Sequence, residues 1–254
     1  MSVPTADNAL WIRRFHPSPD PAVRLVCFPH AGGSASFFFP VSKALSGSME
    51  VLAVQYPGRQ DRRTAPCIDN IEALAEEIYT VMRPWTDSPL AFFGHSMGAV
   101  LAFEVARRLE DRDGVELVGL FASGRRAPSR HRDEYVHTRD DNGIIAELRQ
   151  LSGTDAALLG DEELLRMILP AIRSDYKAIE TYRCDATATI RSPINVMVGD
   201  DDAKTTLDEA RDWARHTTGE FDIRVFPGGH FYLSNHQAEV IDAISDYVRD
   251  VPSS

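Results

Sequence analysis

One stretch of sequence, LAFFGHSMGAVLAFEVAR at residues 90–107, decides the fold. Its apolar start, 90–93, predicts a buried strand, and the run rich in Ala, Leu and Val from 97 to about 109 predicts a helix. The turn between them, GHSMG at 94–98, has the pattern G-x-S-x-G. Small residues at both ends permit a tight strand-to-helix turn that raises a serine hydroxyl into a cleft, so the motif predicts a nucleophile at Ser96.

The rest of the chain repeats this order of strand and helix. Short apolar runs alternate with longer amphipathic ones, as is typical of parallel strands joined by crossover helices. Most of the apolar runs are nearly continuous, which is expected when helices cover both faces of a sheet. We therefore expect an α/β fold with a mostly parallel central sheet flanked by helices. Strands are predicted at 24–28, 51–55, 90–93, 117–121, 194–198 and 223–226, with an extra edge strand at 11–15 and further helices at 71–82 and 240–251.

The segment from about 124 to 188 interrupts this alternation. It contains no clear strand, whereas its apolar residues recur at helical spacing in three groups. The groups are Ile144, Ile145, Leu148 and Leu151; Leu164, Leu165, Ile168 and Ile172; and Tyr176, Ile179 and Tyr182. Helical insertions between strands commonly act as lids over a site. We expect one domain over 1–254 with a helical lid at about 124–188.

Charge and composition exclude several classes of protein. The chain has 254 residues, with 27 Lys and Arg against 38 Asp and Glu, for a net charge of −11. A negative surface repels nucleic acids and anionic membranes, so neither is expected as a partner. The sequence has no apolar run near the roughly 18 to 20 residues of a membrane span and no signal-peptide pattern at its start, so we expect a cytoplasmic protein.

No cofactor or metal ion is expected. The three cysteines, Cys27, Cys67 and Cys184, show no CxxC spacing, which argues against a disulfide framework and a zinc site. The sequence also contains no GxGxxG motif, Walker loop or cluster of metal ligands. None of these patterns therefore competes with the assignment of Ser96.

An activated serine needs a base, which in folds with this kind of turn is a histidine that follows the acidic residue in the chain. His230 stands just after the last predicted strand in FPGGHFYL, where two glycines permit a loop that reaches back over the serine. His216 falls in a helical pattern and His236 lies near a helix start, so both are expected to be solvated or structural. We therefore predict His230 as the base.

The acid is predicted in VGDDDAKTT at 198–206, which follows a strand at the carboxyl edge of the sheet. Asp200, Asp201 and Asp202 compete for this role. The spacing Gly199-x-x-Asp202 matches the usual position of the orienting carboxylate. Asp202 is therefore favoured, and Asp200 remains an alternative.

Two backbone N–H groups are expected to bind an oxyanion. One belongs to Met97, the residue after the nucleophile, and the other to FPHAGG at 28–33, with Ala31 as the donor. The glycines of this loop let the backbone approach a tetrahedral intermediate closely. The alternative is a glycine-rich turn that is needed only for packing.

With these motifs the chain resembles the type II thioesterases, editing α/β-hydrolases that accompany modular polyketide synthases and nonribosomal peptide synthetases. The resemblance extends over nearly the whole length and is carried by FPHAGGSASFF, QYPGRQDR, FFGHSMGAVLAFEVAR, LPAIRSDYKAIETYRC and VFPGGHFYL. One position departs from the pattern, because Asp202-Ala203 stands where many relatives have Asp-Pro or a similar pair. This departure keeps Asp200 open as the acid.

The resemblance implies an α/β-hydrolase fold and hydrolysis of acyl groups from the phosphopantetheine arm of an acyl carrier protein or peptidyl carrier domain, which frees stalled modules. It implies Ser96 as nucleophile, His230 as base and Asp202 as its partner. The amides of Ala31 and Met97 are the implied oxyanion donors. A carrier protein or carrier domain is therefore the expected partner. We also expect the enzyme to be a monomer. A general carboxylesterase or lipase, an acyltransferase and a non-hydrolytic carrier-binding protein stay open as alternatives.

Phe37 and three arginines are candidates for contact with the substrate or the carrier. Phe37 follows the glycine-rich loop and either packs in the core or lines an acyl cavity. Arg59, Arg125 and Arg126 belong to the densest basic groups of an acidic chain. They are either solvated or bind a carrier's acidic surface or the pantetheine phosphate.

Charge is also distributed unevenly along the chain. Residues 123–139 hold five arginines against two acidic residues, a net of +3, whereas 200–222 hold eight acidic against three basic residues, a net of −5. A basic surface on the side of the lid would allow an acidic carrier to bind there.

Overall fold

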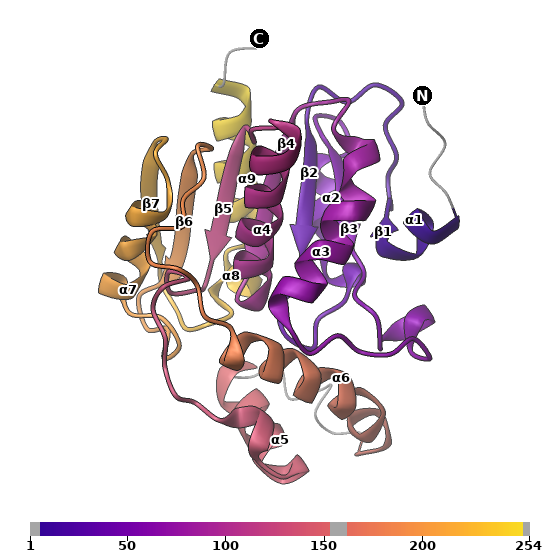
Figure 1. The fold of residues 1–254 in the computed structure, drawn as a ribbon, viewed down its shortest axis with the longest axis vertical. Helices are drawn as coiled ribbons and strands as arrows, with labels where there is room; N and C mark the ends of the chain where they lie inside the picture. The colour runs from indigo at the N-terminus through magenta and orange to yellow at the C-terminus, as the bar shows by residue number, and fades with distance from the viewer. Residues whose placement is uncertain (1–5, 153–161, 251–254) are drawn as a thin grey trace.

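Seven strands form one sheet at the centre of the computed structural model, which describes residues 6–152 and 162–250 (Figure 1). In spatial order they are β1 (Ile12–Arg13), β3 (Glu50–Val54), β2 (Arg24–Phe28), β4 (Leu90–His95), β5 (Gly119–Ser123), β6 (Ile194–Gly199) and β7 (Phe221–Phe226). The strands β3, β2, β4, β5, β6 and β7 are parallel to one another, and β1 runs antiparallel to β3. The predicted mostly parallel sheet is confirmed, and each strand lies within two residues of its predicted bounds.

Helices cover both faces of this sheet. Figure 1 shows α3 (Ile71–Met82) and α4 (Met97–Arg108) in front of the sheet and α9 (Gln237–Asp250) behind it, where α9 contacts α2 (Phe39–Leu45). Alternate side chains of β2 enter opposite cores. Val26 and Phe28 pack in the core that contains α3 and α4, whereas Leu25 packs in the core that contains α9. Burial from both sides explains why the inner strands β2, β4, β5 and β6 are nearly continuous apolar runs, whereas the edge strand β7 contains the charged residues Asp222 and Arg224.

The remaining elements outside the segment between β5 and β6 are mostly short turns of helix. They are α1 (Ala6–Trp11), α7 (Leu207–Arg211), α8 (Tyr232–Asn235), the π-helical turn η4 (Leu109–Asp113) and the 3-10 turns η1 (Ala35–Phe38), η2 (Gln60–Arg62), η3 (Arg83–Trp85) and η6 (Asp212–His216). The helix predicted to end at about 109 therefore ends at Arg108 and continues as η4. Of the helices that the structure describes, none combines the length and the apolar character needed to span a bilayer.

Two helices, α5 (Asp141–Ser152) and α6 (Glu162–Thr181), and the 3-10 turn η5 (Val136–Thr138) lie between β5 and β6 in the sequence. In Figure 1 the two helices sit together at the lower end of the sheet. They share a small core made of Val136, Ile144, Leu169, Ile172 and Tyr176. The second and third apolar groups predicted here belong to one helix, because α6 continues through Pro170. The side chain of Leu164 lies outside the described residues.

The turn between β4 and α4 brings three backbone segments into very close contact. Ser96 takes φ 54° and ψ −118°, which is rare for a residue with a side chain. A Cβ on Gly94 would lie 2.2 Å from the carbonyl oxygen of Gly98, and one on Gly98 would lie 2.1 Å from that of Phe28. Only glycine fits at these two positions, so the G-x-S-x-G spacing is a packing requirement of the turn.

Replacing Gly98 by alanine should lower the free energy of unfolding by at least about 2 kcal/mol, because the added methyl group collides with backbone that cannot move aside. The matched control is Gly47→Ala, where no described atom lies within 4 Å of the added methyl group. Its effect should stay within about 0.5 kcal/mol. Chemical denaturation followed by tryptophan fluorescence measures both values. Small and equal losses in the two variants would contradict the packing requirement.

Candidate active site

Three side chains that the sequence predicts for catalysis meet at the carboxyl ends of the parallel strands. The Oγ of Ser96 lies 3.0 Å from Nε2 of His230. On the other side of the ring, Nδ1 lies 2.9 and 3.0 Å from the two carboxylate oxygens of Asp202. A carboxylate can only accept, so Nδ1 donates to Asp202 and Nε2 accepts from the Ser96 hydroxyl. This is the arrangement of a nucleophile, a general base and a carboxylate that orients the base.

The loops after β6 and β7 pack against each other and bring Asp202 to His230. A Cβ on Gly199 would lie 2.3 Å from the carbonyl oxygen of Gly228, so the two loops touch through backbone. The exposed Asp200 accepts a hydrogen bond from the N–H of Gly228 at 2.8 Å and ties the loops together. Asp202 is buried and reaches the imidazole instead. The geometry therefore favours Asp202 over Asp200 as the acid.

Two further histidines surround His230. The ring centre of His95 lies 5.1 Å from that of His230 and 6.0 Å from that of His30. Burial, followed by the charge of His230, lowers the pKa of His30 to about 3 and holds the pKa of His95 well below its usual range. Nδ1 of His95 is also hydrogen-bonded to the hydroxyl of Ser123 at 2.9 Å. Both rings stay neutral near pH 7, so a positive charge formed on His230 meets no repulsion from them.

Ala31 and Met97 both have a backbone N–H available near the serine. Met97 is the first residue of α4, and the N–H groups of a first helical turn have no acceptor within the helix. The N–H of Ala31 makes no hydrogen bond with any residue that the structure describes. Ala31 lines the same pocket as Ser96. The two predicted oxyanion donors are thus free to bind a ligand.

The glycine-rich loop at 28–33 is held by residues that follow β3. The hydroxyl of Tyr56 donates to the carbonyl oxygen of Pro29 at 3.0 Å. Just beyond the loop, the N–H of Ala35 donates to Oε1 of Gln55 at 2.8 Å. Both supporting side chains are buried, so the loop is fixed near each of its ends.

A pocket of about 710 Å³ is lined by Ser96 and His230. Its apolar wall is formed by side chains of α5 and α6, which are Leu148, Leu151, Ile168, Ile172, Tyr176 and Ile179. Phe37 both lines the pocket and packs against the core, so the two roles weighed for it coexist. The volume is within the range of small-molecule sites, and the helices between β5 and β6 supply much of its apolar surface.

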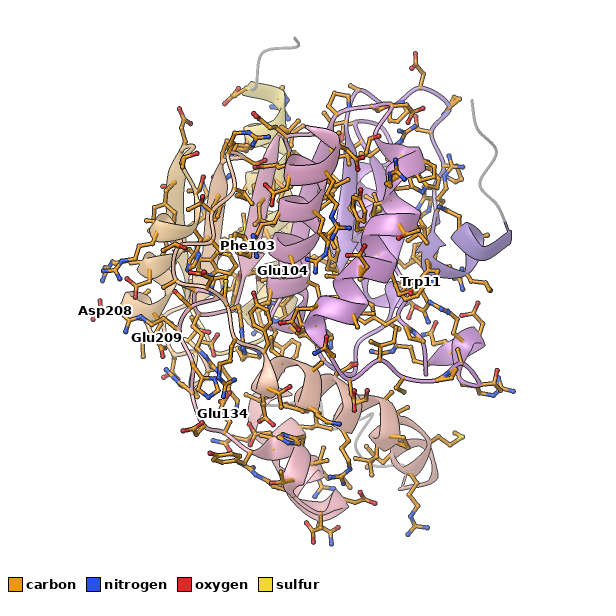
Figure 2. The ribbon with its side chains drawn as sticks, viewed as in Figure 1. Trp11, Phe103, Glu104, Glu134, Asp208 and Glu209 are labelled. Carbon is orange, nitrogen blue, oxygen red and sulfur yellow. The ribbon has the colours of Figure 1, made fainter. Side chains whose placement is uncertain are left out.

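Two of the three arginines predicted to contact a carrier are buried. The side chain of Arg59 is 6% exposed and that of Arg126 is 2% exposed. Arg59 pairs with Asp175 of α6 at 2.7 Å. Arg126 pairs at 2.7 Å with Glu134, which Figure 2 shows on the chain between β5 and α5. Buried, paired guanidinium groups cannot reach the surface of a carrier, so the prediction is wrong for Arg59 and Arg126.

Arg125 is placed differently from its neighbour. Its side chain is partly buried and lines the pocket that contains Ser96. Its guanidinium makes no hydrogen bond or ion pair with the described part of the chain, and its Nε is shielded from solvent. Burial and the nearby charge of Arg126 lower the pKa of Arg125 to about 9, so the group is still charged at pH 7. The guanidinium of Arg125 is therefore a cation on the pocket wall that has no partner among the residues that the structure describes.

The basic and the acidic stretches of the sequence pack against each other. Arg130 pairs with Asp212, and Arg132 pairs with Glu209. Glu209 lies on α7 and is labelled in Figure 2. These ion pairs use basic charges of 123–139 that were expected to attract an acidic carrier. Both charges are thus partly neutralised, and a basic lid side that binds an acidic carrier stays a prediction.

The other histidines weighed as bases lie away from the serine. His216 is buried, and its Nδ1 donates to the carbonyl oxygen of Ala188 at 2.7 Å. Nδ1 of His236 is hydrogen-bonded to Oε1 of Glu239 at 2.7 Å near the surface. Both positions are structural or solvated, as the sequence predicts. Within residues 6–152 and 162–250, no group of three or more His, Cys, Asp or Glu side chains is arranged to hold a metal ion.

Sequence reasoning missed one residue that reaches this region, Asp175. It lies on α6, where Ile172, Tyr176 and Ile179 form an apolar face at helical spacing. Its Oδ2 accepts a hydrogen bond from the N–H of Gly32 in the glycine-rich loop at 2.7 Å. The signal that could have found it is a carboxylate on an apolar helix face, because a charge is rarely buried there without a partner.

Comparisons with known proteins agree with the geometry. The family model of the thioesterase domain matches residues 23–248. The thioesterase PikA5 of Streptomyces venezuelae is 55% identical over 95% of this chain and 86% of its own. The solved structure of the type II thioesterase BorB from the borrelidin biosynthetic cluster has 49% identity and a TM-score of 0.89, and covers 94% of this chain and 98% of its own. The structure of RedJ, a thioesterase from the prodiginine pathway of Streptomyces coelicolor, has 34% identity and a TM-score of 0.83. It covers 89% of this chain and 86% of its own. The predicted α/β-hydrolase fold and the predicted resemblance are confirmed.

Asp202→Asn should lower kcat for ester or thioester hydrolysis by about 10,000-fold, because an amide no longer fixes the tautomer in which Nε2 accepts from Ser96. The matched control is Asp200→Asn, whose side-chain oxygen can still accept from Gly228. This control should keep activity within about threefold of the wild type. Steady-state kinetics at several pH values measure both variants. An active Asp202→Asn together with an inactive Asp200→Asn would assign the acid to Asp200.

Proposed function

The chain belongs to the thioesterase family, and from this membership we propose that it hydrolyses acyl groups from the phosphopantetheine arm of acyl or peptidyl carrier proteins. Enzymes of the family hydrolyse thioesters, and its relatives include type II thioesterases of polyketide and nonribosomal peptide pathways. The proposed task is editing, in which aberrant or stalled acyl units are removed from the synthases. The proposal includes a single domain over 1–254 with a lid at about 124–188, acting as a monomer in the cytoplasm.

The contact between Ser96 and His230 carries this proposal. Because Oγ lies 3.0 Å from Nε2, the hydroxyl proton has an acceptor already in place. The opposite nitrogen of the ring is held by the buried Asp202. The pocket that would receive the acyl group opens onto the same serine and has an apolar wall. A serine, a base and an acyl pocket together support acyl transfer to the serine and then to water.

In the first half-reaction, Oγ of Ser96 attacks the carbonyl carbon of the thioester while His230 takes the hydroxyl proton. The N–H groups of Ala31 and Met97 bind the oxyanion of the tetrahedral intermediate. When the intermediate collapses, the C–S bond breaks and His230 gives its proton to the departing sulfur. The carrier arm leaves as a free thiol, and the acyl group remains as an ester on Ser96.

In the second half-reaction, water replaces the thiol. His230 takes a proton from the water, whose oxygen attacks the ester carbonyl, and the same two N–H groups bind the second oxyanion. Collapse of this intermediate breaks the bond to Ser96, and His230 returns the proton to Oγ. Throughout the cycle Asp202 orients the imidazole and stabilises its positive charge. The products are a carboxylic acid and the free enzyme.

Arg125 is the part of the site that fits the carrier arm. Its guanidinium is charged, lines the pocket and has no partner among the described residues. Arginine forms strong, charge-assisted hydrogen bonds to phosphate and carbonyl oxygens. Such acceptors recur along a phosphopantetheine arm, whereas a short acyl thioester carries fewer of them. We therefore assign Arg125 to binding of the arm.

Mass spectrometry of acyl-loaded carrier domains tests the proposed function. The wild type should remove the acyl mass and release the free acid, whereas Ser96→Ala should be at least about 10,000-fold slower because it lacks the attacking oxygen. An N-acetylcysteamine thioester and a p-nitrophenyl ester with the same acyl group serve as comparison substrates. The acyl carrier should have the highest kcat/KM.

Three other outcomes would contradict this function. A preference for the p-nitrophenyl ester would indicate a general carboxylesterase. Transfer of the acyl group to an acceptor other than water would indicate an acyltransferase. A Ser96→Ala protein that binds carrier and still restores product yield in cells would indicate a non-hydrolytic role.

Arg125→Ala should raise KM about tenfold for acyl-carrier and acyl-phosphopantetheine substrates, and less than about twofold for an acyl-N-acetylcysteamine thioester, because only the former contain the full arm. The control is Arg215→Ala, which removes an arginine side chain that is 74% exposed. It should leave KM unchanged for both substrates. An equal rise of KM for the long and the short substrates in Arg125→Ala would contradict the assignment to the arm.

A further inference from the structure

Helix α6 touches the glycine-rich loop with one of its faces. A Cβ on Gly32 would lie 2.8 Å from Cγ1 of Ile172, so this side chain rests directly on the glycine. Three residues further, Asp175 lies on the same face of the helix, and its Oδ2 accepts the N–H of Gly32 at 2.7 Å. Gly32 has φ +76°, which a glycine adopts without strain. The helix therefore holds Gly32 both by packing and by a hydrogen bond.

Arg59 extends this contact to the next residue of the loop. Its Nη1 and Nη2 donate to the two oxygens of Asp175 at 2.7 and 2.8 Å, which makes a bidentate pair. Nη1 also donates to the carbonyl oxygen of Gly33 at 3.0 Å. The two side chains are 6% and 2% exposed, so water hardly competes for these bonds. Asp175 and Arg59, here called the clamp, together hold the N–H of Gly32 and the carbonyl of Gly33.

The clamp acts next to the proposed oxyanion donor, Ala31. The N–H of Gly32 and the carbonyl of Ala31 belong to one planar peptide unit, so holding this N–H fixes the rotation of the chain after Ala31. Two consecutive glycines otherwise have a wide range of backbone angles. An oxyanion donor is effective only when it stays within about half an ångström of its productive position. A loop containing Gly32 and Gly33 therefore needs an external support to present Ala31 correctly.

We propose that Asp175 is a positioning residue for the oxyanion hole. When α6 is seated on the glycine-rich loop, the clamp is closed and the N–H of Ala31 points at the carbonyl oxygen of the substrate. Helix α6, which forms part of the apolar wall of the pocket, thus also completes the oxyanion hole, so this one helix contributes to both acyl binding and oxyanion stabilisation. This inference rests on the proposed function, because it takes Ala31 as an oxyanion donor.

Removing a single partner of a buried ion pair leaves an unpaired charge and can unfold the protein, so two clamp variants are needed. Asp175→Asn keeps the shape and one acceptor oxygen but loses the bidentate pair. The double variant Arg59→Met/Asp175→Leu replaces the pair by apolar side chains, which often preserves stability. It holds neither Gly32 nor Gly33. If the first variant fails to fold, the second still tests the proposal.

The matched control is Lys177→Ala. Lys177 lies on the same helix and forms an exposed ion pair with Asp69, so its removal also takes away a link between α6 and the rest of the protein. It does not touch the glycine-rich loop. All variants are assayed with a p-nitrophenyl ester, and the active serines are counted with a fluorophosphonate. Binding is measured for a trifluoromethyl ketone, whose adduct with Ser96 carries an oxyanion, and for the matching unreactive amide.

In both clamp variants kcat per active serine should fall about 10- to 100-fold with KM changed less than about twofold, because a misplaced donor weakens the transition state and not the ground state. Affinity for the ketone should fall by the same factor, and affinity for the amide should not change. Lys177→Ala should match the wild type in every measurement.

A folded clamp variant with unchanged kcat per active serine and unchanged ketone affinity overturns the proposal. A parallel loss of ketone and amide affinity also overturns it, because that result describes a damaged pocket. Failure of the proposed function gives a different result, in which the wild type does not hydrolyse acyl carriers. The kcat values of the clamp variants for the p-nitrophenyl ester can still be compared with that of the wild type in this case.

Discussion

The contact of three backbone segments at the turn after β4 is the constraint on which the active site depends. With Gly94 against Gly98, and Gly98 against Phe28, α4 leaves the sheet in one direction and Ser96 is held at a positive φ. The remaining polar groups come from loops at the same edge, because parallel strands all end there. His230, the proposed base, follows β7, and Asp202, the proposed acid, follows β6, so the order of the sheet brings both to Ser96.

Among the described residues, most charges around the serine are balanced locally, with Arg125 as an exception. Asp202 is paired with His230, and Arg59 with Asp175, while burial keeps the rings of His30 and His95 neutral. In a medium of low dielectric constant each unpaired charge is costly, so pairing is what permits many ionisable groups near one serine. The net charge of −11 therefore does not describe the field inside the site.

Local sequence patterns were sufficient where packing restricts the residue type. A strand covered on both faces must be apolar throughout, and a turn in which a Cβ would collide must be glycine, so the sheet and the turn around Ser96 were predictable. The arginines were not, because a buried and an exposed arginine look alike until the partner is known. Arg59 and Asp175 are 116 residues apart. The continuity of α6 across Pro170 was equally hidden, because proline in a sequence usually marks a helix boundary, whereas here tertiary packing maintains the helix.

Two effects of α6 on the reaction come from neighbouring positions of one helix face. Ile172 lines the apolar wall, which lowers the local dielectric constant and would strengthen each hydrogen bond to an oxyanion. Asp175 holds the loop that contains Ala31, the proposed oxyanion donor. A displaced α6 would lose both effects at once. Deacylation nevertheless requires a water molecule at His230, so that water must enter while the helix stays seated. Polar side chains that line the same pocket, among them Arg125 and Lys204, offer such a water molecule hydrogen-bonding groups.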